Sequence, residues 1–102
     1  MIIMEYCKLG DLEKEIMDRR KSKKYFKESE IWHMWMYIVL AIHELNRDKK
    51  NKICHRGITP DNILIDENFV LKLGDFGHSK IVNHDNSFAM TNINASKYMA
   101  PE

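Results

Sequence analysis

The sequence predicts an α+β chain that forms one small domain. Two stretches, residues 11–20 and 29–45, repeat apolar side chains at the three- and four-residue spacing of an α-helix. Further along, short apolar segments at residues 63–65 and 70–73 flank a turn-forming run, and this pattern predicts a two-stranded β-ribbon. A chain of 102 residues has room for one such domain at most.

The N-terminal part is predicted to form a strand followed by a helix. Residues 1–6 are apolar and favour strands, and the Lys8-Leu9-Gly10 run ends this segment. Asp11 is suited to cap the N-terminus of a helix that continues to about Arg20. The basic residues between 19 and 27 are interpreted as a solvated helix end and loop.

The second helix, residues 29–45, is apolar around most of its circumference. A helix of this kind is normally buried between other elements, so we expect its Trp and Met side chains to pack in a core. The apolar positions are Ile31, Trp32, Met34, Trp35, Met36, Ile38, Val39, Ala41, Ile42 and Leu45. A polar, Lys-rich loop then leads to a short strand at residues 53–54.

Composition bounds the cellular setting and the class of partner. Charged residues make up 30% and the net charge is +1, so no global field favours nucleic acid. The two cysteines are widely spaced, which indicates a reducing compartment. The longest apolar run, residues 34–42, is too short to span a membrane, and the N-terminus lacks the features of a signal peptide. We expect a cytoplasmic protein, with nuclear or cytoskeletal association left open.

Two polar motifs meet at one end of the predicted ribbon. The string HRGITPDN at residues 55–62 precedes its first strand, and DFG at residues 75–77 follows its second. They match the H-R-D-L-x-x-x-N catalytic loop and the D-F-G turn of protein kinases, except that Gly57 replaces the aspartate.

The whole chain resembles a segment of a protein kinase domain, from the hinge strand to the A-P-E motif, and is most similar to the NIMA-related serine/threonine kinases. MEYC at residues 4–7, GDL at 10–12, LGDFG at 73–77 and NHDNSFA at 83–89 carry this resemblance. It implies a partial kinase fold, mainly the first part of the large helical lobe. The implied parts are a hinge strand (1–7), helices (11–45), the catalytic loop and D-F-G ribbon (53–77) and an activation segment (78–102).

The resemblance implies an ATP site at the N-terminal end. Met4 matches the gatekeeper, and residues from Glu5 to Cys7 match the hinge whose backbone contacts adenine. Asp11 would approach the ribose, and Leu64 would form the floor of the adenine pocket. ATP and a protein substrate or partner are therefore the implied ligands.

The resemblance also implies a magnesium site and a regulatory pair. Asn62 and Asp75 match the side chains that hold Mg²⁺ under the phosphates. Thr91 falls where the activation loop of the family is often phosphorylated, and Arg56 is placed to receive that phosphate. Residues 83–97 are expected to form a mobile loop.

Three departures from the family pattern predict impaired phosphotransfer, as in a pseudokinase. Gly57 lacks the carboxylate that accepts the substrate proton, and Thr59 replaces the lysine that neutralises the transferring phosphoryl group. Ala95 replaces a threonine that bridges those two side chains. The alternatives are an active kinase whose small lobe lies outside this chain, and a gene remnant without a stable fold. Because a kinase covers helix 29–45 with later helices, the resemblance also implies exposed tryptophans here.

Overall fold

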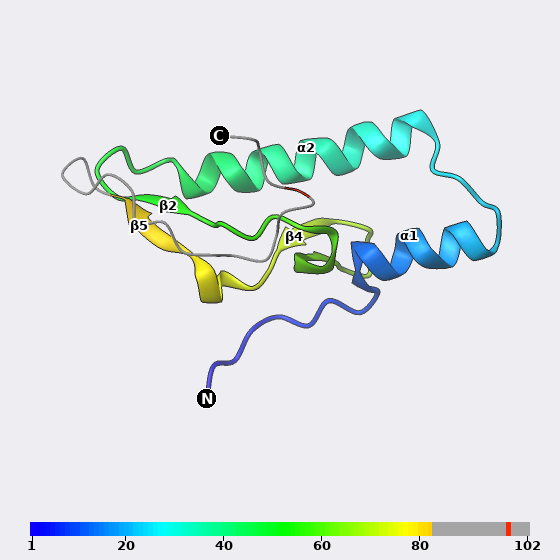
Figure 1. The fold of residues 1–102 in the computed structure, drawn as a ribbon, viewed down its shortest axis with the longest axis horizontal. Coiled ribbons are helices and arrows are strands. Elements are labelled where there is room, and N and C mark those ends of the chain that lie inside the picture. Colours follow the sequence, from blue (N-terminus) through cyan, green and yellow to red (C-terminus); the bar gives the residue numbers. More distant parts are fainter. Residues whose placement is uncertain (83–97, 99–102) are drawn as a thin grey trace.

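The computed structural model of the chain describes residues 1–82 and residue 98. The expected mobile loop, Thr91 and Ala95 lie outside these residues. The described part contains two α-helices, two short 3₁₀ helices (labelled η) and two small antiparallel sheets (Figure 1). The elements are β1 (Gly10–Asp11), α1 (Leu12–Lys21), α2 (Glu28–Leu45), β2 (Lys52–Cys54), η1 (Pro60–Asn62), β3 (Ile63–Ile65), β4 (Leu71–Leu73), η2 (Phe76–His78) and β5 (Lys80–Val82).

Helix α1 begins where the sequence predicts. The backbone of Asp11 is extended, and its Oδ1 accepts a hydrogen bond of 2.7 Å from the backbone N–H of Lys14. This bond satisfies one of the amides that a helix N-terminus leaves without an intrahelical partner. The prediction of a capped helix from Asp11 is confirmed.

Helix α2 also occupies the predicted residues, but its surroundings differ from the core position that its apolar periodicity indicates. Met34 is buried and faces β4, whereas Trp32 and Trp35 are 61% and 58% exposed. The expectation of core packing for these tryptophans is wrong, because no described element covers that face of the helix. The exposure that the kinase resemblance implies is confirmed.

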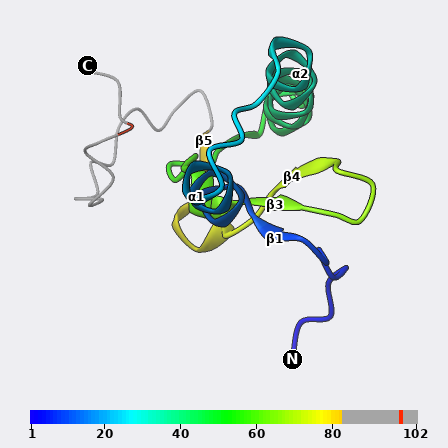
Figure 2. The same ribbon diagram turned by 90° about the vertical axis from the view of Figure 1, so that its right-hand side faces the viewer.

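The two sheets position the polar motifs. In the first sheet, β3 lies between β1 and β4, and Figure 2 shows β4 on the side of α2. Asp66 fixes the turn between β3 and β4, since its Oδ1 accepts the backbone N–H groups of Asn68 and Val70 at 2.8 and 2.9 Å. In the second sheet β2 pairs with β5, placing Ile53 opposite Ile81. The sequence predicted β2 but not its partner strand.

The prediction of a strand at residues 1–6, and with it the hinge strand assigned to residues 1–7, is wrong. No strand is present before Gly10, and the side chain of Met4 is 80% exposed. A strand exists only through pairing, and within the described residues no other strand runs beside this segment. The first pairing contact of the chain is the hydrogen bond from the N–H of Leu9 to the carbonyl oxygen of Ile65.

The core is small and joins both helices to the first sheet. Ile65 is fully buried, and the other buried apolar side chains are Leu12, Met34, Ile63 and Leu71. A chain of this size buries a modest part of its surface, so polar contacts between elements contribute a larger share of its stability.

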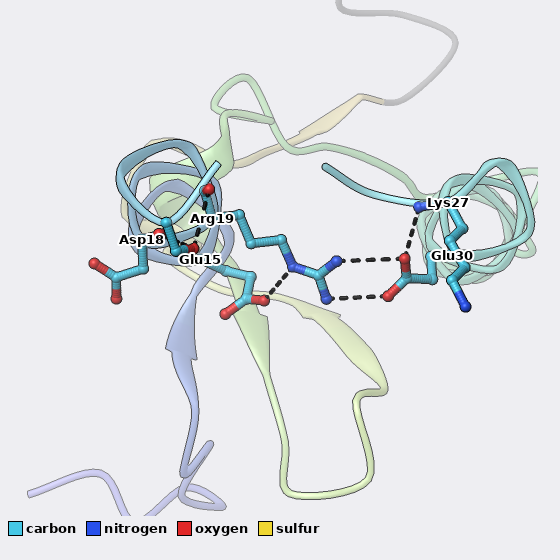
Figure 3. Close-up of polar contacts among 6 residues, drawn as sticks. Glu15, Asp18, Arg19, Lys27 and Glu30 are labelled. Atoms are coloured by element: carbon cyan, nitrogen blue, oxygen red, sulfur yellow. Dashed lines mark hydrogen bonds and ion pairs between the residues drawn. The ribbon is translucent and has the colours of Figure 1, made fainter. Parts of the chain in front are cut away.

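Arg19 provides the main polar contact between the two helices (Figure 3). Its guanidinium contacts both carboxylate oxygens of Glu30, at 3.0 and 3.3 Å, and its Nε donates to Glu15 at 2.7 Å. The guanidinium also lies 4.0 Å from the centroid of the Phe26 ring. Hydrogen bonding to Glu15 and Glu30 raises the pKa of Arg19, and the bond to Arg19 is the largest cause of a lowered pKa for Glu30.

Candidate functional site

The loop from His55 to Asn62 connects β2 to β3 and holds the candidate catalytic positions. The single turn η1 closes the loop, with the N–H of Asn62 donating to the carbonyl oxygen of Thr59 at 3.0 Å. Pro60 stands in the first turn of η1, where its missing N–H is tolerated. These local contacts shape the end of the loop that leads into β3.

His55 connects this loop to the turn after β4. Its side chain is 3% exposed, and its Nε2 donates to the carbonyl oxygen of Gly74 at 2.9 Å. Its ring lies edge-on to Phe76 with 4.7 Å between the ring centroids. This contact packs the catalytic loop against the D-F-G turn. Because a carbonyl only accepts, Nε2 carries a hydrogen, and Nδ1 is buried with no hydrogen-bond partner in the described part of the chain.

Asn62 makes the second connection between the two motifs. Its backbone carbonyl oxygen accepts the N–H of Gly74 at 2.8 Å, which holds the residue before Asp75 against the end of the loop. Its side-chain Nδ2 donates to the carbonyl oxygen of Gly57 at 2.9 Å. The amide group is thereby oriented with Oδ1 left as an acceptor.

Asp75 starts the D-F-G turn in a left-handed conformation, with φ of 52°. Few non-glycine residues adopt such a backbone, and they are concentrated at functional sites. One carboxylate oxygen accepts the N–H of Gly77 at 3.1 Å, and the residue is exposed. An exposed carboxylate fixed at one oxygen leaves its second oxygen available for a cation.

The glycine at position 57 is not required by the backbone. Gly57 is buried, yet a Cβ placed on it would lie 3.4 Å from Asn62 Nδ2 and 3.8 Å from His55 Nδ1, which are ordinary contact distances. Its φ is outside the positive range that favours glycine. The fold therefore has room for a Cβ where the kinase aspartate stands, so the backbone does not require glycine at position 57.

The residues predicted to contact the nucleotide are only partly brought together. Asp11 and Leu64 are direct cross-strand partners in β1 and β3, and a Cβ on Gly74 would lie 3.1 Å from Leu64 Cδ1. Met4 is exposed and Cys7 is half-buried in the segment before β1. The expected roles of these residues in adenine and ribose binding stay predictions.

Of the regulatory pair Arg56 and Thr91, only Arg56 lies within the residues that the structure describes. The Nε of Arg56 donates to the carbonyl oxygen of His78 at 2.6 Å, which joins the catalytic loop to η2. Thr91 is outside the described residues, so the proposed phosphate contact stays a prediction.

The sequence interpretation overlooked Lys72, which is two residues before Gly74. Its Nζ lies 2.7 Å from Glu5 Oε1 and 3.6 Å from Asp66 Oδ2. The available signal was a charged residue between two apolar ones in the strand at 71–73, which places its side chain on the opposite face of the sheet.

Comparison with known proteins identifies the family. The family model described as "Protein kinase domain" matches residues 1–102. The chain belongs to the protein kinase family, and its mixed α+β architecture is that of a partial protein-kinase fold.

Among its relatives are kinases of the NIMA-related type. Serine/threonine-protein kinase Nek2 of Mus musculus is 39% identical over 103 residues, which is 99% of this chain and 23% of the relative. A probable serine/threonine-protein kinase nek2 of Dictyostelium discoideum is 42% identical over 101 residues, or 99% of this chain and 24% of the relative. G2-specific protein kinase fin1 of Schizosaccharomyces pombe is 32% identical over 117 residues, or 99% of this chain and 16% of the relative.

The chain thus spans about a quarter or less of the length of these relatives. The resemblance to NIMA-related kinases that the motifs indicate is confirmed. Among the helices of the described residues, none combines the length and apolar character needed to cross a membrane.

Proposed function

We propose that this chain binds Mg²⁺–ATP and acts through a protein partner or substrate, with phosphotransfer impaired as in a pseudokinase. The observation that carries this proposal is that the catalytic loop keeps its hydrogen bonds, although residue 57 has no carboxylate. His55 and Asn62 still hold the loop against the D-F-G turn, while Gly57 offers no base. A positioned base typically contributes about 10²- to 10⁴-fold to a rate, so its loss alone predicts weak catalysis.

The donor set around the D-F-G turn fits magnesium. Asn62 and Asp75 supply hard oxygen ligands, and the hydrogen bonds described above orient both side chains. The described residues contain no group of three His, Cys, Asp or Glu side chains that could hold a metal on its own. A magnesium ion on Asn62 and Asp75 would therefore need the oxygens of a bound phosphate to complete its shell.

Two further departures support the loss of phosphotransfer. Thr59 carries no charge to neutralise a transferring phosphoryl group, and Ala95 has no hydroxyl. When bound, Mg²⁺ would neutralise charge on the phosphates, and the chain would contribute binding without the base or the cation that favour transfer.

Thermal unfolding of the 102-residue chain with and without Mg²⁺–ATP tests nucleotide binding. A ligand that binds only the folded chain raises its stability with ligand concentration, so we expect the midpoint to rise with Mg²⁺–ATP and not with ATP plus chelator. Asp75→Asn removes the charge but keeps the acceptor for the N–H of Gly77, so it should fold and lose the shift. No shift in the natural chain would contradict the proposal, and no cooperative transition would favour the gene-remnant alternative.

Phosphotransfer is tested in a fusion that supplies the glycine-rich loop and strand lysine of a related kinase. The fusion with the natural sequence should be inactive on a Ser/Thr peptide, and the variant Gly57→Asp, Thr59→Lys, Ala95→Thr should gain activity. An active fusion with the natural sequence would overturn the pseudokinase proposal in favour of an active kinase completed from outside this chain.

A further inference from the structure

Residues 1–7 are joined to the rest of the fold mainly through one side chain. The segment contains no helix or strand, and Met4 and Tyr6 are 80% and 85% exposed. Within the described residues, its strongest polar contact is the 2.7 Å ion pair between Glu5 and Lys72. The position of this segment therefore depends on what holds Lys72.

Lys72 is itself fixed by the turn between β3 and β4. Its ammonium lies 3.6 Å from Asp66 Oδ2, while the other carboxylate oxygen of Asp66 accepts two backbone N–H groups of the same turn. Asp66 is thus rigidly placed, and its side chain is 18% exposed. The hydrogen bond to Glu5, followed by the charges of Glu5 and Asp66, raises the pKa of Lys72 and keeps it charged.

Sheet register places this ion pair on a defined face. Lys72 is the cross-strand partner of Leu64, and Leu64 is the cross-strand partner of Asp11. Direct cross-strand partners project from the same face of a sheet. Lys72 therefore extends from the same face as Leu64, and its contact draws Glu5 toward that face.

We propose that Lys72 is a positioning residue, which holds the Glu5 carboxylate so that residues 4–7 lie over the sheet face that carries Leu64. This inference rests on the proposed function, because the segment so placed is the one expected to contact adenine. Lys72 touches no nucleotide in this scheme. It acts by restricting residues 4–7 before a ligand arrives, which lowers the ordering cost of binding.

Two measurements on the 102-residue chain test the proposal. The first is the ¹H–¹⁵N heteronuclear NOE at the amides of residues 3–8, which reports motion on the picosecond to nanosecond scale. The second is the Kd for Mg²⁺–ATP. Lys72→Met should lower the NOE values and raise the Kd by about two- to fivefold, the range expected for an exposed ion pair. Lys72→Arg keeps the charge, so its NOE values and its Kd for Mg²⁺–ATP should stay close to those of the natural chain.

The matched control is Lys8→Met, which removes the same charge close to the same segment. The pair between Lys8 and Glu67 is 4.0 Å long, and both side chains are largely exposed, so this variant should leave the NOE values and the Kd unchanged. Glu5→Gln should reproduce the effect of Lys72→Met on the NOE values and the Kd, and combining the two changes should add nothing, because both variants remove the pair between Glu5 and Lys72.

The outcomes separate this inference from the proposed function. Unchanged NOE values in Lys72→Met, or an equal loss in Lys8→Met, would overturn the positioning role. If the natural chain binds no Mg²⁺–ATP, the proposed function fails, and the NOE comparison still decides whether Lys72 restricts the segment.

Discussion

His55 and Gly74 are joined by a hydrogen bond of 2.9 Å, from Nε2 of the imidazole to the backbone carbonyl oxygen. This bond connects the loop that contains Gly57 to the turn that begins at Asp75. Both candidate magnesium ligands lie within the segments that it joins, so the geometry of the site depends on this buried ring.

The first prediction concerns that bond. His55→Phe keeps an aromatic ring against Phe76 but leaves the Gly74 carbonyl oxygen without its donor. We expect the free energy of unfolding to fall by about 1–2 kcal/mol, since an unsatisfied and partly buried polar group is destabilising. Urea denaturation followed by circular dichroism measures this change. The exposed His43→Phe serves as control, and equal effects of the two substitutions would contradict the prediction.

The second prediction compares two glycines. Gly57→Ala should change the free energy of unfolding by less than about 1 kcal/mol, because its Cβ would meet only ordinary contact distances. Gly10→Ala should destabilise the chain by about 1 kcal/mol or more, because Gly10 has φ of +85°. Urea denaturation of both variants checks the ranking. A larger loss for Gly57→Ala would mean that position 57 requires glycine.

The third prediction concerns acid stability. Because its pKa is lowered in the folded chain, chiefly by Arg19, the Glu30 carboxylate stabilises the fold above its ordinary pKa of 4.5. That contribution is lost as the pH falls below 4.5 through the lowered pKa. The unfolding midpoint should therefore fall more steeply from about pH 7 to about pH 3 in the natural chain than in Glu30→Gln. Parallel curves would show that the pair with Arg19 contributes nothing measurable.

The fourth prediction concerns the cap of α1. Asp11→Ala removes the acceptor for the N–H of Lys14 and should reduce the free energy of unfolding by about 1 kcal/mol. Asp11→Ser retains an acceptor and should lose only a small part of that stability. Helical circular dichroism and urea denaturation distinguish the two variants. Equal losses would indicate that Asp11 stabilises the chain through its charge and not as a cap.

The features that the sequence predicts correctly are determined by neighbours in the chain. The side chain of Asp11 bonds to an amide three residues later, and the apolar spacing of residues 29–45 is a property of the helix itself. The β3–β4 ribbon follows from a turn that Asp66 closes within a few residues. Each of these signals can be read in a short window.

The features that it does not predict depend on distant residues. Residues 1–6 favour a strand, but the chain supplies no partner for them within its described part. The pairing of Ile81 with Ile53 and the contact of Lys72 with Glu5 join segments far apart in the sequence. Helix periodicity likewise predicts that Trp32 packs in a core. Whether Trp32 is exposed depends instead on which other elements lie beside the helix.

The exposed tryptophans of α2 have a spectroscopic consequence. Trp32 and Trp35 are the two tryptophans of the chain, and both are more than half exposed. Their emission in the folded chain should already resemble that of indole in water, so unfolding should shift its wavelength little. Any molecule that covers this face of α2 should shift the emission to the blue, which makes the natural chain its own fluorescent reporter.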